Sequence, residues 1–204
     1  MTVKKKGFSV VILAAGESKR FGSPKQLAEF GEEPLLVHVI NKITSCEVEP
    51  YIAVGANSKL IREHEAFHPY LRNMIPIKNW QGGLSETIKE SVEFLKSMHS
   101  EGVIFLLADQ PLIPIDFLKQ FFLKVENNPA ALLCTVYKSN RISLGVPAYF
   151  PRLFFNELLL VQGDRGAKSI LEKYNSDYLS CNDGLLDIDE PEDLAQALSI
   201  FKKL

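Results

Sequence analysis

The chain has 204 residues, enough for one domain with a substantial core, and 46% of them are hydrophobic, as is usual in globular proteins. Its formal charge of −2 argues against nucleic acid or an anionic membrane as a partner. Three widely spaced cysteines without a C-x-x-C pair favour a reduced, cytoplasmic chain. No run approaches the ~18 apolar residues of a membrane span, so the short apolar run near the start is predicted as a first strand with a basic lead-in.

The first half of the chain alternates between two kinds of segment. Short apolar runs rich in β-branched residues are predicted as buried strands at 8–14, 51–55 and 102–108. Apolar residues at a spacing near 3.6 predict helices at 34–43, 84–98 and 115–125. This alternation predicts a three-layer α/β/α sandwich with a Rossmann-like, mostly parallel sheet.

The second half is less regular, and it favours some antiparallel pairing. Strands are predicted at 131–137, 146–150, 177–180 and 185–188, with helical stretches near 152–161 and 166–174. A closing helix begins at Pro191, with acidic residues early and lysines late, which suits the helix dipole. We expect a single domain over residues 1–204.

The stretch LAAGESKRFGSPK, residues 13–25, follows the first predicted strand. In open α/β sheets, ligands bind outside the carboxyl ends of the strands. Small residues there let the backbone approach a ligand, Gly16 is able to adopt a positive φ, and Arg20 and Lys25 supply positive charge. The sequence fits neither G-x-x-x-x-G-K-[ST] nor G-x-G-x-x-G, so a phosphate cradle and a plain polar loop both remain open.

Two further segments lie at positions suited to ligand binding. Asp109 is the first charge after an apolar strand, where a carboxylate can hold Mg²⁺ or simply form a turn before Pro111. Gly83 and Ser85 lie at the start of a predicted helix, where they can bind a nucleotide oxygen or only cap the helix.

The segment HEAFH at 64–68 matches the zinc motif H-E-x-x-H. Pro69 follows directly and is expected to end the helix there, and a third zinc ligand is not evident. We therefore expect an ordinary amphipathic helix end rather than a metalloprotease.

Five motifs in order resemble those of the MobA-like nucleotidyltransferase family. The opening stretch resembles its L-A-[AG]-G-x-S-x-R-M-G-x-x-K signature, LLADQPLI its strand-end aspartate, and GLSETIKESV its helix start. GVPAYF with QGDRGAKSIL, and then LLDIDEPEDL, resemble elements of the molybdenum cofactor cytidylyltransferase branch, which includes xanthine dehydrogenase maturation relatives. The resemblance spans residues 10–195 and implies a GT-A-like fold, as in nucleotide-diphospho-sugar transferases.

The resemblance implies a nucleotide half at about 1–115 and an acceptor half at about 116–204. Leu13, Ala14, Ala15, Gly16, Gly83 and Ser85 would line the nucleotide site, and Arg20, Lys25 and Asp109 would be catalytic there. Asp109 with Asp187 or Asp189 would hold Mg²⁺ as the cofactor. Ala15 is similar to the CTP-using branch, whereas a glycine there is typical of the GTP-using branch.

The acceptor implied by the resemblance is molybdopterin or another phosphorylated small molecule. Its site would include Gly145, Pro147, Gly163, Asp164, Gly166 and Lys168. Val146 stands where the family often has histidine, and Lys168 replaces an arginine, which exchanges a bidentate fork for a point charge. These departures leave the acceptor more open than the nucleotide.

Three functions therefore remain as expectations. The first is CMP transfer from CTP to molybdopterin with release of pyrophosphate, without a covalent nucleotidyl-enzyme. The second is a maturation factor that delivers molybdenum cofactor to a molybdoenzyme of the xanthine dehydrogenase type. The third is a nucleotidyltransferase for another phosphorylated acceptor, because this architecture serves many acceptors.

Overall fold

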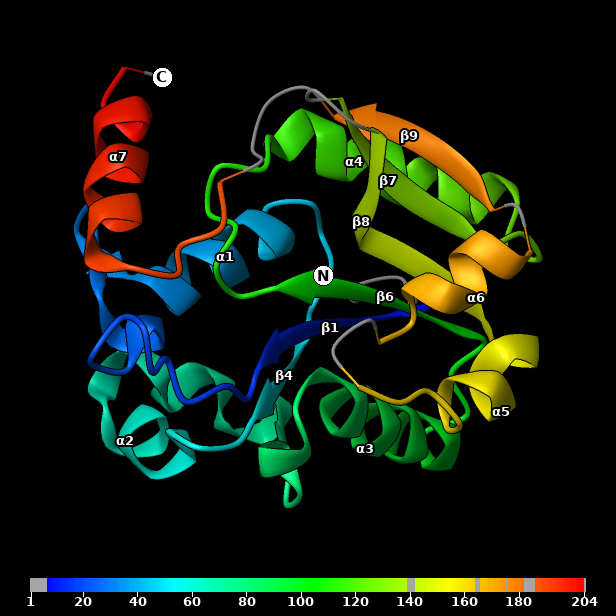
Figure 1. The fold of residues 1–204 in the computed structure, drawn as a ribbon, viewed down its shortest axis with the longest axis horizontal. Coiled ribbons are helices and arrows are strands. Elements are labelled where there is room, and N and C mark those ends of the chain that lie inside the picture. The colour runs from blue at the N-terminus through cyan, green and yellow to red at the C-terminus, as the bar shows by residue number, and fades with distance from the viewer. Residues whose placement is uncertain (1–6, 139–141, 164–165, 175, 182–185, 204) are drawn as a thin grey trace.

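A seven-stranded sheet runs through the computed structural model, which describes residues 7–138, 142–163, 166–174, 176–181 and 186–203. The strand order is β5-β4-β1-β6-β8-β7-β9 (Figure 1). The strands are β1 (Ser9–Ala14), β4 (Tyr51–Val54), β5 (Met74–Pro76), β6 (Gly102–Leu107), β7 (Leu133–Lys138), β8 (Ile142–Pro151) and β9 (Asp177–Cys181). Strand β8 is antiparallel to both of its neighbours, and the other pairings described for this sheet are parallel. The prediction of a mostly parallel sheet with some antiparallel pairing is confirmed.

Helices cover both faces of the sheet. The described α-helices are α1 (Leu35–Thr44), α2 (Ser58–Glu63), α3 (Leu84–Ser97), α4 (Ile115–Asn127), α5 (Phe155–Leu158), α6 (Lys168–Lys173) and α7 (Pro191–Phe201). In Figure 1, α1 and α4 lie on one side of the central strands and α3 lies on the other. No helix in the described part of the chain is long and apolar enough to cross a membrane.

The central strand β1 explains why the fold has three layers. Its side chains alternate, so Val10 and Ile12 pack into the core shared with α1 and α4. Val11 and Leu13 pack into the opposite core, which α3, α5 and α6 complete. A strand that buries both faces reads as a continuous apolar run, which is why the sequence pattern identified it.

The C-terminal helix α7 packs at the opposite edge of the molecule from β9 (Figure 1). A third core cluster joins its Ala197 to Phe30 and Leu35, which lie near the short antiparallel pair β2 (Glu29–Phe30) and β3 (Glu33–Pro34). Ile188, just before the helix, is fully buried in this cluster. The cluster therefore anchors the segment that carries Asp187 and Asp189.

The strand predicted at 185–188 is wrong for its described part, since residues 186–189 have no regular secondary structure. The amide of Ile188 donates to the carbonyl of Asp109 at 2.9 Å. The carbonyl of Ile188 accepts instead from the Lys25 ammonium at 2.7 Å. The Lys25 side chain thus binds the carbonyl that a neighbouring strand would otherwise pair with. Leu185, the first residue of the predicted strand, lies outside the described residues.

The helix end predicted at His68 is also wrong. Helix α2 already ends at Glu63, and a 3₁₀ run over Glu65–Asn73 includes Pro69. The residues directly before Pro69 form a 3₁₀ run rather than an α-helix. The clash of a proline ring with the carbonyl four residues back, which ends an α-helix, therefore does not apply here. The helix predicted near 152–161 is shorter than expected, with a 3₁₀ turn at Arg152–Phe154 leading into α5.

Gly102, the first residue of β6, gives a test of the packing between the two halves of the sheet. A Cβ atom there would lie 2.5 Å from Cε2 and the hydroxyl oxygen of buried Tyr149 on β8. That hydroxyl donates to the carbonyl of Pro129 at 2.8 Å, which hinders the ring from moving away. We expect Gly102→Ala to lower the free energy of unfolding by about 1–3 kcal/mol.

Urea unfolding followed by circular dichroism measures this loss. Gly7→Ala is the matched control, because a Cβ there meets nothing within 4 Å. Equal midpoints for the two variants would contradict the packing argument.

Candidate active site

The loop after β1 is folded by its own hydrogen bonds. The left-handed residues of this loop are Ser18, with φ 62°, and Gly22, with φ 80°, and the positive φ that was open to Gly16 is not observed. The carbonyl of Ser18 accepts from the amides of Phe21 and Gly22, and its hydroxyl accepts from the amide of Lys25. This turn directs Arg20 and Lys25 back toward the carboxyl ends of β1 and β6.

Gln26 holds this loop against the sheet, and the sequence analysis missed it. Its side chain is almost completely buried, and its amide nitrogen donates to the carbonyls of Ala14 and Gly16 at 3.0 Å each. Its oxygen accepts from Asn57 at 3.2 Å and from Ser18 at 3.4 Å. A buried glutamine with all of these partners fixes the backbone path from β1 into the loop.

Lys25 is the centre of a charged cluster. Its ammonium lies 2.6 Å from Oδ2 of Asp109 and 3.2 Å from Oδ1 of Asp189. The carbonyl of Ile188 is the third oxygen around it. Arg20, with a side chain 68% exposed, pairs with Oδ2 of Asp189 at 2.9 Å. Arg20 and Lys25, which were predicted to bind phosphate, therefore form ion pairs with predicted metal-binding carboxylates.

Asp109 lies in a poorly solvated position, with 17% of its side chain exposed. Burial raises the pKa of its carboxyl; the ammonium of Lys25 opposes this shift, whereas Asp187 and Asp189 add to it. Its Oδ1 is buried without a hydrogen-bond partner among the described residues. An unpaired carboxylate oxygen beside a second carboxylate is a donor set that suits a hard divalent cation.

The side chains of Asp187 and Asp189 have different partners, although the two residues are only two positions apart in the sequence. Asp189 joins the Lys25 cluster, and its amide donates to the carboxylate of Asp193 at 3.0 Å. The amide of Glu190 also donates to this carboxylate, at 2.8 Å, and the hydrogen bonds from Glu190 and Asp189 lower the pKa of Asp193. Asp187 instead accepts from the side chain of Gln110 at 2.7 Å. The structure therefore pairs Asp189 with Lys25, whereas Asp187 is bonded to Gln110 although it is near enough to Asp109 to raise the pKa of that carboxyl.

A cavity of about 300 Å³ opens above the carboxyl end of β1. It is lined by these predicted site residues: Leu13, Ala14, Ala15, Gly16, Arg20, Lys25, Gly83, Asp109 and Asp189. Ser85 is not among the lining residues, because it is buried and its hydroxyl bonds to the carbonyl of Gly82. Thr87, two residues further along α3, lines it instead.

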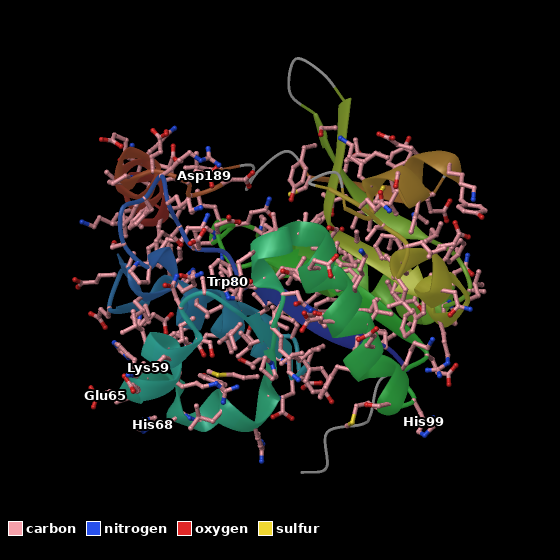
Figure 2. All side chains as sticks on the ribbon, turned by 60° about the horizontal axis from the view of Figure 1, so that its bottom comes forward. Lys59, Glu65, His68, Trp80, His99 and Asp189 are labelled. Carbon is pink, nitrogen blue, oxygen red and sulfur yellow. The ribbon has the colours of Figure 1, made fainter. Side chains whose placement is uncertain are left out.

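Trp80 also lines this cavity and was missed by the sequence analysis. A Cβ atom at Gly55 would lie 2.6 Å from Trp80 Cβ and 2.7 Å from the carbonyl of Ala15. The glycine at the end of β4 thus allows Trp80 to approach β1. The lining of the cavity runs from Trp80, beside Gly55 at the end of β4, to Asp109 and Asp189 beyond the end of β6. Figure 2 labels Trp80 and Asp189.

A second cavity of about 380 Å³ adjoins the first, since Leu13, Leu84 and Leu107 line both. It contains two of the predicted acceptor residues, Gly145 and Lys168. The other predicted acceptor residues for which the structure gives a position, Pro147, Gly163 and Gly166, do not line it, and Asp164 lies outside the described residues. The sheet thus carries two neighbouring cavities with the charged cluster beside them.

The H-E-x-x-H segment lies elsewhere. Figure 2 shows Glu65 and His68 at the outer edge of the molecule with Lys59, far from Asp189. The His64 ring accepts from the amide of Ala66 and packs against Phe67. No group of three or more metal-binding side chains is found in the described part of the chain. The expectation that this segment is not a zinc site therefore stays a prediction.

Gln26 allows the clamp on the loop to be tested. We expect Gln26→Met to lower the free energy of unfolding by about 1–3 kcal/mol, because the substitution leaves the carbonyls of Ala14 and Gly16 without their donor. Urea unfolding is the measurement, with Gln120→Met on the exposed side of α4 as the matched control. A loss no larger than that of the control would contradict the clamp.

Comparisons with known proteins identify relatives of this chain along most of its length. A molybdenum cofactor guanylyltransferase of Vibrio atlanticus is 28% identical over 194 residues, which cover 92% of this chain and 94% of that protein. The purine catabolism protein PucB of Bacillus subtilis is 24% identical, over 90% of this chain and 92% of its own length.

Solved structures share the fold. Rv0371c of Mycobacterium tuberculosis superposes with a TM-score of 0.78 at 22% identity, over 96% of this chain and 99% of that chain. A further structure of that protein is a complex with manganese, with a TM-score of 0.72 at 22% identity over 94% of this chain and 98% of that one. The model of the MobA-like NTP transferase domain matches residues 10–178. The chain therefore belongs to the MobA-like NTP transferase family and is a nucleotidyltransferase.

Proposed function

We propose that this protein transfers CMP from CTP to the terminal phosphate of molybdopterin and releases pyrophosphate. The observation that carries the proposal is the pair of adjoining cavities beside the Lys25, Asp109 and Asp189 cluster. One cavity suits the nucleotide and the other suits the acceptor. Similarity to a molybdenum cofactor guanylyltransferase supports the acceptor, and the resemblance of Ala15 to the CTP-using branch supports the base.

The reaction joins two anions, so the main task of the site is to cancel repulsion and align the groups. An oxygen of the acceptor phosphate attacks the α-phosphorus of CTP, and the bond from that phosphorus to the bridging oxygen breaks as pyrophosphate leaves. Arg20 and Lys25 would neutralise the triphosphate. No described residue is needed as a covalent nucleophile.

The first cavity also supports an orientation for the nucleotide. Trp80, Gly83 and Thr87 form its wall toward α3, where a base can stack on an aromatic ring. The charged residues lie toward β6, where the phosphates would meet the cations. Because the attacking oxygen and the leaving pyrophosphate lie roughly in line, the α-phosphate would face the second cavity and the pyrophosphate would leave away from it.

Asp109 and Asp189 would hold a magnesium ion, with the unpaired Oδ1 of Asp109 as one ligand. When bound, the ion would supply positive charge for the phosphate oxygens. In this structure, the same carboxylates are neutralised by Arg20 and Lys25. Binding of a triphosphate would draw these cations to its oxygens and release the carboxylates, so the site exchanges one set of ion pairs for another.

A second function, delivery of molybdenum cofactor to a molybdoenzyme of the xanthine dehydrogenase type, is favoured by the similarity to a purine catabolism protein. Delivery requires binding without turnover. Catalysis and delivery are also compatible within one protein.

Pyrophosphate release across CTP, GTP, UTP and ATP, with and without molybdopterin, tests the proposed function. We expect release to require both magnesium and molybdopterin and to be fastest with CTP. Fastest release with GTP would contradict the assignment of the base. Binding of CTP without turnover with any acceptor would favour delivery over catalysis.

The exchange of ion pairs predicts metal binding in a Lys25 variant. Lys25→Met removes the cation that occupies the oxygens of Asp109, Asp189 and Ile188, so Mn²⁺ alone should bind about tenfold more tightly than to the wild type. Electron paramagnetic resonance of free Mn²⁺ measures this affinity. The same variant should lose pyrophosphate release, because it lacks a cation for the triphosphate.

The control adds Asp109→Asn to Lys25→Met, which should remove the gained affinity. Equal Mn²⁺ affinity for the wild type and Lys25→Met would show that the lysine does not compete for these oxygens. Full turnover by Asp109→Asn alone would remove Asp109 from the metal site.

A further inference from the structure

Consecutive residues at the end of β6 face different cavities. Asp109 lines the first cavity, whereas Gln110 lines the second. The segment before α7 divides in the same way, with Asp189 at the first cavity and Asp187 at the second. The backbone bond from Ile188 to Asp109 holds the two segments together, so their side chains form one pair on each side. The first pair is the charged cluster, and the second is Gln110 with Asp187.

The Gln110–Asp187 bond fixes the orientation of the amide. A carboxylate only accepts hydrogen bonds, so the group 2.7 Å from Asp187 is the amide nitrogen of Gln110. The side-chain oxygen, Oε1, then remains buried without a partner among the described residues. Gln110 is 5% exposed, and an unpaired acceptor in such a place is unfavourable until a donor reaches it.

The second cavity indicates what kind of molecule would bring that donor. Most of its wall is apolar and includes Phe105, Leu144, Val146, Phe150 and Leu171. This wall suits a flat or apolar body rather than a fully hydroxylated one.

The polar groups of this cavity are few. The hydroxyl of Tyr137 is already used, because it donates to the carbonyl of Val146 at 2.6 Å. Lys168 is suited to a phosphate oxygen, and Ser143 is a further polar side chain in the wall. Within the described residues, Oε1 of Gln110 is thus the buried acceptor of this cavity that a ligand can satisfy.

From this geometry, we infer that Gln110 recognises the acceptor substrate: its Oε1 accepts a hydrogen bond from an N–H or O–H group of a phosphate ester with a flat or apolar body. Asp187 holds the amide in the orientation that presents this oxygen. The inference rests on the proposed function, because it assigns the second cavity to the acceptor. Beyond the proposed function, it makes Gln110 a residue that determines specificity for the acceptor but not for the nucleotide.

Exchanging the amide of Gln110 and the carboxylate of Asp187 tests this inference. Gln110→Leu removes Oε1 and should raise the dissociation constant of molybdopterin about tenfold. Gln110→Glu keeps an acceptor oxygen but sets two carboxylates against each other, so it should also weaken binding. Adding Asp187→Asn to Gln110→Glu restores a donor–acceptor pair and leaves one oxygen for the ligand, so it should recover most of the affinity. Adding Asp187→Asn to Gln110→Leu should not.

Calorimetric titration with molybdopterin gives these constants. Fluorescence of Trp80, the sole tryptophan, gives the CTP affinity of the same variants, which should stay unchanged. Gln120→Leu on exposed α4 is the matched control. A merely structural role for Gln110 would change the affinity for CTP as well.

Wild-type affinity for molybdopterin in Gln110→Leu overturns the inference, and so does failure of the reversed pair to recover binding. If the wild type releases no pyrophosphate from CTP and molybdopterin, the proposed function fails, and the same variants are titrated with pyridoxine 5′-phosphate, a phosphate ester with a flat ring and O–H donors. Loss and recovery with that acceptor would support Gln110 alone. Binding of neither acceptor to the wild type would overturn both.

Discussion

The ammonium of Lys25 connects the parts of the chain on which the site depends. It lies among oxygens of Asp109, Ile188 and Asp189, and so links the loop after β1, the end of β6 and the segment before α7. These segments are up to 164 residues apart in sequence. Like charges would otherwise force the two carboxylates apart, so the cation holds the site closed. Under the proposed function, a bound triphosphate would have to rearrange this same contact.

The three-layer fold allows two ligands to meet. Parallel strands deliver the ends of β1, β4 and β6 to one edge of the sheet, and antiparallel β8 supplies the neighbouring wall with Leu144 and Val146. The two cavities consequently share side chains such as Leu13 and Leu107. The proposed reaction between two anions would depend on this adjacency, because holding the reacting groups side by side lowers the barrier.

Sequence patterns were most accurate for strands that are buried on both faces and for features that depend on neighbouring residues. The runs that form β1, β4 and β6 are apolar on both faces, and α3 begins beside Gly83 as expected. They were wrong at 185–188, where a long-range contact from Lys25 replaces a strand ladder. Ser85 was nominated from its place in the helix, but it turns inward and Thr87 faces the cavity. Gln26, Trp80 and Gln110 were missed, since an isolated glutamine or tryptophan carries no spacing signal.

By itself, the sequence determined strands β1, β4 and β6, helices α1, α3 and α4, the glycine-containing basic loop and the aspartate at a strand end, because each depends on neighbouring residues. It left Asp187 and Asp189 equivalent. Only the tertiary structure separated them, because the Ile188 amide bonds to Asp109 and so directs the flanking carboxylates to different cavities. The pairing of Arg20 and Lys25 with acids, rather than with solvent, was likewise decided by folding, since it joins residues that have no relation along the chain.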